Sequence, residues 1–203
     1  MYLNKILIKG NACRNPYEIH RALWKLFPED TGAHREFLFR VTHGDWNRAE
    51  ILMQSFEIPE RSSNTAQIIA RKEYNPILSS GQRLRFLLIA NPIKTINDET
   101  GRKNSNGEVK KCRVPLIREK DQQSWIERKL QNAASFEKLV IDPVFPLRFR
   151  KNKENRAGKI QPISFQGILK VSEPESMMAL VQAGIGPAKA FGCGLLSLAK
   201  GYY

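Results

Sequence analysis

Tyr17, His20 and Trp24 are the residues of this chain whose types and spacing best suit chemistry. They stand at i, i+3 and i+7, so on a helix they lie along one stripe and close to one another. A histidine titrates near neutral pH and can accept or donate a proton, which makes His20 a candidate general base or acid. On spacing alone, a histidine at the surface or at the edge of the core is the commoner explanation.

A second candidate is the glycine-rich segment 184–194, GIGPAKAFGCG. One hypothesis is a phosphate-binding loop, because glycines let backbone N–H groups approach phosphate oxygens. The other is a tight connection between a helix and a strand, and the residues alone favour neither. The spacing is not GxGxxG, which argues against a dinucleotide site. The candidate phosphate-contacting residues are Gly184, Gly186, Lys189, Gly192 and Gly194.

The chain is strongly basic, with 33 Lys and Arg against 20 Asp and Glu, a formal charge of +13 and an isoelectric point near 9.9. This charge predicts a polyanionic partner, most commonly a nucleic acid. Two tracts combine many cations with few acidic residues, which suits binding of a polyanion. The alternative is that these cations form an ordinary solvated charged face. The first tract comprises Arg102, Lys103, Lys110, Lys111, Arg113 and Arg118, and the second comprises Arg148, Arg150, Lys151, Lys153, Arg156 and Lys159.

Several other classes of protein are disfavoured by the sequence. The cysteines are scattered and form no CxxC pair, which argues against a disulfide framework and a structural zinc site. The histidines show no HExxH or HxH spacing, so we expect no metal and no cofactor. We find no apolar stretch of about 20 residues and no signal peptide, and therefore expect a cytoplasmic protein. These residues are Cys13, Cys112 and Cys193, and His20, His34 and His43.

The best-marked element is a helix that begins at Pro16. Asn15 is a good N-cap, Pro16 suits the first turn, and Glu18 completes a variant of the capping box. Pro28 is expected to end the helix. Apolar residues at helical spacing predict its core face, namely Ile19, Ala22, Leu23, Leu26 and Phe27.

The first part of the chain predicts an order βαββαβ around this helix. Residues 3–8 form the expected first strand, and runs 37–41 and 51–54 form a hairpin with a polar turn between them. A weaker helical segment follows at 65–73, and alternating residues at 83–90 predict a half-buried strand. This order is that of a ferredoxin-like unit, in which helices cover one face of an antiparallel sheet.

The second part predicts a related unit, although no close sequence repeat links the two. The polar stretch 97–111 reads as a mobile loop. A helix is expected around 125–134, and strands at 139–150 and 160–171 flank a basic connection. The last elements are a helix from Glu173 with a Ser172/Glu175 capping box and an end at Gly184, then a strand at 195–199.

We therefore predict an α+β protein of tandem ferredoxin-like (RRM-like) βαββαβ domains. The expected N-terminal domain, 1–90, carries the candidate catalytic helix. The expected C-terminal domain, 91–203, carries the basic hairpin and the glycine-rich loop.

Five segments of this chain resemble the CasE family of CRISPR-associated endoribonucleases. The resemblance reaches both ends of the chain and its middle, and the C-terminal segment is the most specific. The segments are NPYEIHRALWKLFP at 15–28, ANPIKT at 90–95, KCRVPLI at 111–117, GKIQ at 158–161 and GIGPAKAFGCGLLSLA at 184–199.

The resemblance implies tandem ferredoxin-like domains and metal-independent cleavage of a CRISPR repeat on the 3′ side of a stem-loop. It implies that His20 is the active-site histidine, that Tyr17 serves on the same helix, and that Lys159 assists. The implied partners are the repeat RNA, as precursor and as mature guide, and the other subunits of the type I-E complex Cascade. The basic tracts and the glycine-rich segment would contact RNA, with the second tract against the stem.

RNA carries its own nucleophile, the 2′-hydroxyl, so proton transfer and charge stabilisation suffice for cleavage. The expected products are a 2′,3′-cyclic phosphate or 3′-phosphate and a 5′-hydroxyl. The alternative function is a non-catalytic RNA-binding subunit of a CRISPR ribonucleoprotein, because a fold does not specify an activity.

Overall fold

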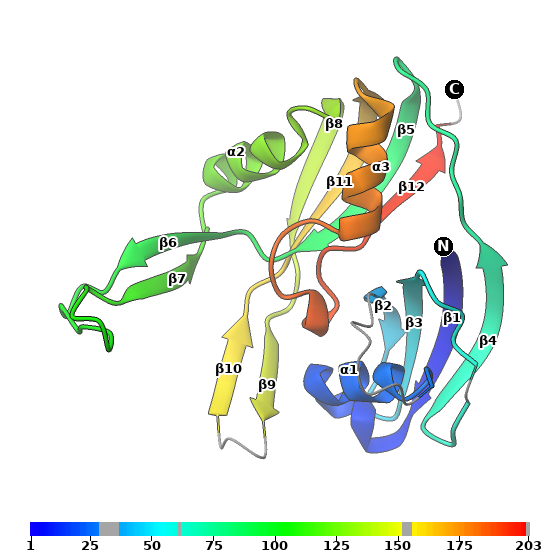
Figure 1. Ribbon diagram of the computed structural model, residues 1–203, viewed down its shortest axis with the longest axis horizontal. Helices are drawn as coiled ribbons and strands as arrows, with labels where there is room; N and C mark the ends of the chain where they lie inside the picture. The colour runs from blue at the N-terminus through cyan, green and yellow to red at the C-terminus, as the bar shows by residue number, and fades with distance from the viewer. Residues whose placement is uncertain (29–36, 61, 152–155, 202–203) are drawn as a thin grey trace.

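The computed structural model describes residues 1–28, 37–60, 62–151 and 156–201, which form two sheet-based units (Figure 1). The first unit is a four-stranded antiparallel sheet in the order β2-β3-β1-β4. Its elements are β1 (Tyr2–Lys9), the 3₁₀ turn η1 (Gly10–Arg14), α1 (Pro16–Trp24), β2 (Phe37–Gly44), β3 (Arg48–Ser55) and β4 (Ala66–Glu73).

Helix α1 covers one face of this sheet and begins where the sequence predicts. The Oδ1 atom of Asn15 accepts a hydrogen bond from the backbone N–H of Tyr17 at 3.1 Å, and Pro16 occupies the first turn. Leu23 packs with Ile6, Phe39 and other strand residues in a buried apolar cluster. The helix proper ends at Trp24, before the expected end at Pro28.

One predicted element of the first unit is wrong. Residues 65–73 were expected to be helical, but 66–73 form the edge strand β4, which pairs with β1. Isoleucines 68 and 69 favour a strand, and pairing with a distant strand outweighs the weak helical pattern. The described residues between β3 and β4 form no helix, so the sheet keeps the ferredoxin-like strand order with only α1 upon it.

The second unit is another four-stranded antiparallel sheet, in the order β12-β5-β11-β8. If its four strands are counted in chain order, this sheet has the same strand order as the first sheet. The hairpins β6–β7 and β9–β10 are inserted between these strands in the sequence. Its elements are β5 (Arg83–Ala90), β6 (Ile93–Asn97), β7 (Lys111–Pro115), α2 (Glu119–Leu130), β8 (Ala134–Pro143), β9 (Leu147–Lys151), β10 (Arg156–Ile160), β11 (Ile163–Val171), α3 (Pro174–Ala183), the 3₁₀ turn η3 (Lys189–Phe191) and β12 (Leu196–Lys200).

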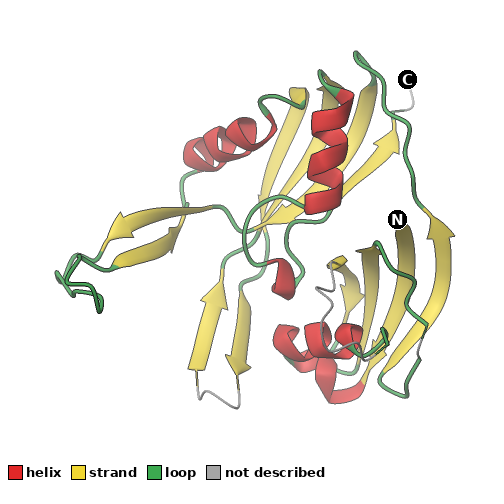
Figure 2. Cartoon of the chain, viewed as in Figure 1, coloured by secondary structure: helices red, strands yellow, loops and turns green. Residues whose placement is uncertain are grey.

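Strand β5 was expected to complete the first unit but pairs with β11 and β12. A division after residue 90 would therefore cut the second sheet. We propose that the two units divide between β4 and β5 instead. Tandem ferredoxin-like architecture holds, and Figure 2 shows α2 and α3 over the second sheet.

The predicted strand at 139–150 is divided between β8 and β9, whereas that at 160–171 is essentially β11, and β10 lies in the predicted connection. Strands β8 and β11 join the main sheet, whereas β9 and β10 pair separately as a two-stranded ribbon, here called the basic ribbon. Pro146 and Pro162 lie at the two breaks, and proline cannot donate a ladder hydrogen bond. This interruption lets the basic ribbon leave the sheet and extend beside the first unit (Figure 1).

Helix α3 ends as predicted but begins differently. Gly184 caps its C-terminus at φ 73°, a conformation that glycine adopts easily. The expected capping box at Ser172 is wrong, because Glu173 is the N-cap and no side chain caps the helix. The backbone N–H of Ser172 instead donates to the carbonyl of Ala133 at 2.9 Å.

Side-chain hydrogen bonds join the two units. The guanidinium of buried Arg40 donates to the Ser197 hydroxyl at 3.0 Å, and Gln54 Nε2 donates to the Val181 carbonyl at 2.8 Å. These bonds position the first sheet against α3 and β12. Among the described residues, no helix is both long and apolar enough to cross a membrane.

Candidate active site

His20 lies on α1 at the border between core and solvent. Its neighbours Ile19 and Leu23 are buried, whereas His20 itself is half-buried. Its ring centroid lies 5.3 Å from that of Phe37 and 6.2 Å from that of Phe39, both on β2. An aromatic wall therefore holds one side of the imidazole and restricts its rotation.

Burial lowers the pKa of His20 below its ordinary value of 6.5. The cause is desolvation, which disfavours the charged imidazolium. At neutral pH the free protein therefore holds His20 mainly as neutral imidazole. This is the form that can accept a proton.

Two further aromatic residues share the stripe of His20 on α1. Tyr17 is half-buried and precedes His20 by three residues, which places both on the same side of the helix. Trp24 is 39% exposed, and its ring centroid lies 5.9 Å from that of His20. The predicted stripe is thus formed, with His20 between a phenol and an indole.

An open cleft of about 580 Å³ separates the N-terminal end of α1 from the basic ribbon. Lys159 lines the cleft from β10, and Arg148, its register partner on β9, lines it too. Arg14 and Asn15 form the opposite wall, and β9 lies against α1. The structure thus brings Lys159 close to the N-terminal end of the helix that carries His20. His20 lies about 7.5 Å along the helix axis from Asn15.

Arg14 is a site residue that sequence reasoning missed. Its guanidinium donates to the Trp46 carbonyl and to Asn47 Oδ1, both at 3.4 Å, which holds it at the cleft. It stands directly before the N-cap of α1, where backbone N–H groups and the helix dipole favour an anion. The Asn15 cap was the signal that marked this end of the helix.

The other cations of the basic ribbon are placed by its strands. Arg150 and Lys151 lie in β9 and Arg156 in β10, where Arg156 pairs with Lys151. Lys153 lies outside the described residues. RNA contact by these residues stays a prediction.

The glycine-rich segment forms a tight connection between α3 and β12. A Cβ atom at Gly184 would lie 2.8 Å from the Leu38 methyl carbons, and one at Gly192 would lie 3.3 Å from Phe39. Gly194 also has a positive φ, of 94°, and the ammonium of Lys189 donates to the Ala183 carbonyl at 2.6 Å. Close packing therefore accounts for these glycines, and phosphate contact by the segment stays a prediction.

The segment also supports the wall behind His20, because Gly192 approaches Phe39 and η3 lies against α1. Gly186 has φ 82° and faces the ring of Trp125 on α2. The segment thus contacts α2, β2 and α1, and a larger residue at Gly192 would press on Phe39 and so disturb the wall behind His20.

All of the first basic tract except Arg118, the N-cap residue of α2, lies on a separate hairpin, β6–β7, which extends from the second unit away from α1 (Figure 1). Its tip, expected to be a mobile loop, is organised by Asp98, which accepts hydrogen bonds from Thr100 and Arg102 and pairs with Arg102 at 2.7 Å. These hydrogen bonds hold the pKa of Asp98 well below its usual range. The other members, Lys103, Lys110, Lys111, Arg113 and Arg118, are exposed, and Arg118 pairs with Asp121 at 2.9 Å.

The fold and the site define the class of the protein: two ferredoxin-like units in one chain, with a histidine-bearing helix facing a basic ribbon. The family description "CRISPR associated protein" matches residues 1–200. The chain belongs to the CasE (Cse3) family of CRISPR-associated proteins.

Two curated relatives match over nearly their whole length. The CRISPR system Cascade subunit CasE of Escherichia coli (strain K12) is 42% identical, across 98% of this chain and 99% of the relative. The CRISPR-associated endoribonuclease Cse3 of Thermus thermophilus is 32% identical, across 98% of this chain and 100% of the relative.

Solved structures agree with this assignment. The crystal structure of Cas6e from E. coli K-12 matches with a TM-score of 0.85 at 42% identity, covering 98% of this chain and 100% of that one. A structure of CRISPR endoribonuclease Cse3 bound to 19-nucleotide RNA matches with a TM-score of 0.76 at 31% identity, covering 98% and 100%.

Proposed function

We propose that this chain is a metal-independent endoribonuclease that cuts the repeat stem-loop of precursor CRISPR RNA. The observation that carries the proposal is the neutral, half-buried His20 on α1, with the cleft that bears Lys159 and Arg148 at the N-terminal end of that helix. Support comes from a relative named an endoribonuclease and from a similar structure bound to RNA.

In the proposed reaction, the 2′-hydroxyl attacks the adjacent phosphorus and its proton passes to His20. The new 2′-O–P bond forms as the P–O5′ bond breaks, and the 5′ oxygen leaves with a proton from solvent water; His20 later returns its proton to solvent. The products are a 2′,3′-cyclic phosphate, which water can open to a 3′-phosphate, and a 5′-hydroxyl. The lowered pKa of His20 supports the role of base, because the imidazole is already neutral when the substrate arrives.

Tyr17 and Lys159 are proposed to act on the reacting phosphate. The phenol of Tyr17 holds the scissile nucleotide or donates to a phosphate oxygen. The ammonium of Lys159, exposed at the cleft, offsets the negative charge that develops as phosphorus becomes five-coordinate. Preorganised charges of this kind act without further rearrangement during the reaction.

The stem is proposed to lie against the basic ribbon, whose strands carry Arg148, Arg150, Lys151 and Arg156. Such contacts read the shape and backbone of the RNA, because the major groove of an RNA helix is deep and narrow. The β6–β7 hairpin adds a second set of cations along the RNA. Each phosphate contact adds to the salt dependence of binding.

After cleavage, the protein is proposed to stay on the mature guide RNA and to join the other Cascade subunits. The name of the E. coli relative, a Cascade subunit, supports this step. A cytoplasmic location follows from the same proposal, because the precursor RNA is made there.

Cleavage of an end-labelled repeat hairpin in excess EDTA tests the proposal. Wild-type protein is expected to cut once, to leave a 2′,3′-cyclic phosphate or 3′-phosphate and a 5′-hydroxyl, and to leave RNA with a 2′-deoxy nucleotide at the cut intact. Loss of cutting in EDTA, or products with a 5′-phosphate, would instead indicate a metal nuclease. RNA binding with no cutting under any condition would favour the non-catalytic subunit.

A further inference from the structure

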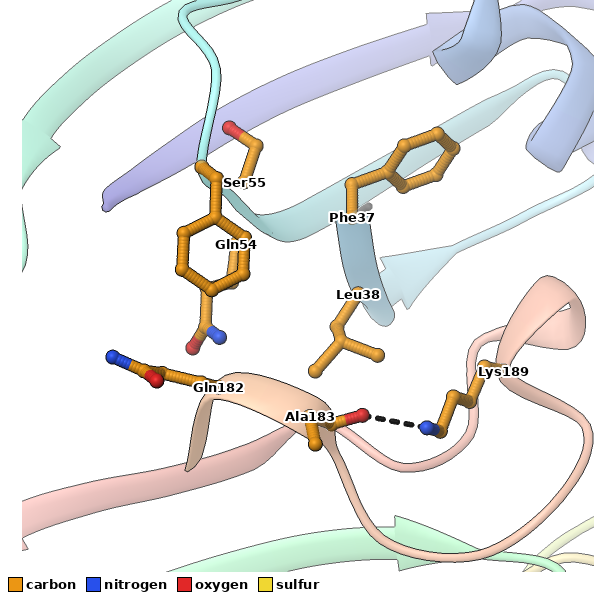
Figure 3. Close-up of a pocket in the computed structure, with 8 residues that line it drawn as sticks. Phe37, Leu38, Gln54, Ser55, Gln182, Ala183 and Lys189 are labelled. Atoms are coloured by element: carbon orange, nitrogen blue, oxygen red, sulfur yellow. Dashed lines mark hydrogen bonds between the residues drawn. The ribbon is translucent and has the colours of Figure 1, made fainter. Parts of the chain in front are cut away.

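A pocket of about 350 Å³ lies between the first sheet and the end of α3 (Figure 3). Its size falls in the range of about 300–1,000 Å³ that is common for small-molecule sites. Phe37 and Leu38 line it from β2, Gln54 lines it from β3, and Gln182 and Lys189 line it from the opposite side. The proposed reaction uses none of these side chains.

Gln54 has a buried acceptor without a partner in this pocket. Only 3% of the residue is exposed, and its Nε2 donates to the Val181 carbonyl at 2.8 Å, which fixes the orientation of the amide. Its Oε1 atom has no hydrogen-bond partner among the described residues. Figure 3 shows the Gln54 amide pointing toward α3, where Gln182 and Ala183 lie. A buried acceptor without a donor is unfavourable, so the site suits a ligand that brings an N–H group. Less than 1 Å² of Oε1 is accessible, so a side chain of the pocket wall has to shift to admit that group.

The pocket lies across the edge strand β2 from the aromatic wall of His20, because Leu38 faces the second unit whereas Phe37 and Phe39 face α1. Phe37 lines the pocket through β2, while its ring turns toward α1 (Figure 3) and lies 5.3 Å from the His20 ring. The exposed ring of Trp24 lies 6.2 Å from that of Phe37. An RNA strand that passes His20 on the Trp24 side therefore enters this pocket by turning around the edge strand β2.

The two ends of α1 face different surroundings. The cleft and the basic ribbon lie at the N-terminal end, at Arg14 and Asn15. The rings of Trp24 and Phe37 lie toward the C-terminal end. If the stem occupies the ribbon side and the cut lies at His20, the unpaired nucleotides 3′ of the cut continue toward the pocket. This step rests on the proposed function.

We propose that the pocket binds one unpaired nucleobase 3′ of the scissile phosphate, with Gln54 Oε1 accepting an N–H from the edge of the base. Leu38 provides an apolar surface, and the exposed amide of Gln182 and the ammonium of Lys189 supply further hydrogen-bonding groups. Lys189 already donates to the Ala183 carbonyl at 2.6 Å, so its charge is fixed at the wall of the pocket. Gln54 is then a specificity-determining residue that keeps the strand in register at His20.

The test measures binding of a fluorescent repeat hairpin that has a 2′-deoxy nucleotide at the cut and so cannot be cleaved. Each unpaired position 3′ of the cut is replaced in turn by an abasic nucleotide. Wild-type protein is expected to lose about tenfold in affinity at one position and little at the others. Gln54→Met is expected to bind intact RNA about tenfold more weakly than the wild type does. With RNA that is abasic at the sensitive position, the variant and the wild type are expected to bind equally, because both changes remove the same contact.

Two further variants separate a lost contact from a damaged fold. Gln182→Ala changes an exposed pocket residue, spares the Gln54–Val181 bond, and is expected to weaken binding several-fold with the same positional dependence. Gln123→Ala removes an exposed glutamine on α2 that bonds Glu127, and is expected to bind like wild type. Melting temperatures of all variants are compared with that of the wild type.

The proposal is overturned if wild-type protein binds every abasic RNA within about twofold of intact RNA. It is also overturned if Gln54→Met and Gln182→Ala still lose as much affinity as the wild type does when the sensitive position is made abasic. Because the readout is binding, it is independent of cleavage. A wild type that binds with this positional pattern but never cuts cleavable RNA would contradict the proposed function and leave the pocket assignment standing.

Discussion

The ring of Phe149 on the basic ribbon lies against the ring of Phe191 in the glycine-rich segment, with centroids 4.3 Å apart. This contact joins two elements that lie about 40 residues apart in the sequence. Phe149 stands between Arg148 and Arg150 on β9, and its register partner Gly158 precedes Lys159 on β10. The aromatic contact therefore anchors the ribbon that carries Lys159 to the segment that supports the wall of His20.

Gly158→Ala tests this anchor. A Cβ atom there would clash with the ζ carbon of Phe149, so the ring has to shift and its contact with Phe191 is disturbed. We expect a cost of about 1–3 kcal/mol, mostly local to the ribbon, and a larger fall in RNA cleavage than in melting temperature. Single-turnover cleavage and thermal unfolding measure the two effects.

Gly44→Ala is the matched control for this substitution. Gly44 lies in β2, its φ is not in the left-handed region, and the nearest atoms to an added Cβ lie 3.5 Å away. It is expected to cleave like the wild type. Equal losses in both variants, or full activity in Gly158→Ala, would argue against the anchor.

Lys159→Met is expected to lower both the cleavage rate and the salt dependence of RNA binding. Loss of one phosphate contact should reduce the slope of log affinity against log salt concentration by about 0.7–0.9. The side chain is exposed, so we expect no loss of fold. Lys138→Met, on the open face of the second sheet, should leave both quantities unchanged. An unchanged rate in Lys159→Met would remove Lys159 from the site.

The pH dependence of cleavage follows from the environment of His20. Burial lowers its pKa below 6.5, so the neutral base persists to a lower pH than for a free histidine. The value of kcat/KM, which reports the ionisation of the free enzyme, should therefore rise with pH and reach a plateau. The midpoint of this rise should lie below about pH 6.5. A midpoint well above that value, or a rate that falls as His20 loses its proton, would indicate that His20 acts as the acid.

Thiol labelling tests the packing of the glycine-rich segment. Cys193 is fully buried between Gly192 and Gly194, and burial raises its pKa to about 12. Iodoacetamide at pH 8 should therefore leave Cys193 unmodified in the folded protein and modify it after denaturation, as mass spectrometry can show. Rapid labelling of Cys193 in the folded protein would mean that this segment opens readily.

Local signals predicted the part of the site that lies on one helix. The Asn15 cap, Pro16 and the apolar spacing placed α1, and the stripe of Tyr17, His20 and Trp24 follows from helix geometry alone. Tandem ferredoxin-like architecture was also predicted. The strand at 66–73 was not, because its partner β1 lies far away in the sequence and pairing decided its structure.

The cleft could not be predicted, because it depends on contacts between distant segments. Arg14 and Lys159 are separated by most of the chain, and they line one cleft because the basic ribbon leaves the sheet at the breaks that Pro146 and Pro162 mark. The roles of the glycines also could not be predicted, because they depend on which side chains pack against them. Gly192 and Gly158 each face an aromatic ring. No periodicity in the sequence marks such contacts.

The most direct measurement of the central claim compares His20→Ala with His43→Ala on a labelled repeat hairpin. His43 is exposed on β2 and is the matched control. We expect His20→Ala to lose about 10²- to 10⁴-fold in cleavage rate while it binds uncleavable RNA within about twofold of wild type, and His43→Ala to match wild type in both. Cleavage by His20→Ala at the wild-type rate would contradict the assignment of His20 as the catalytic residue.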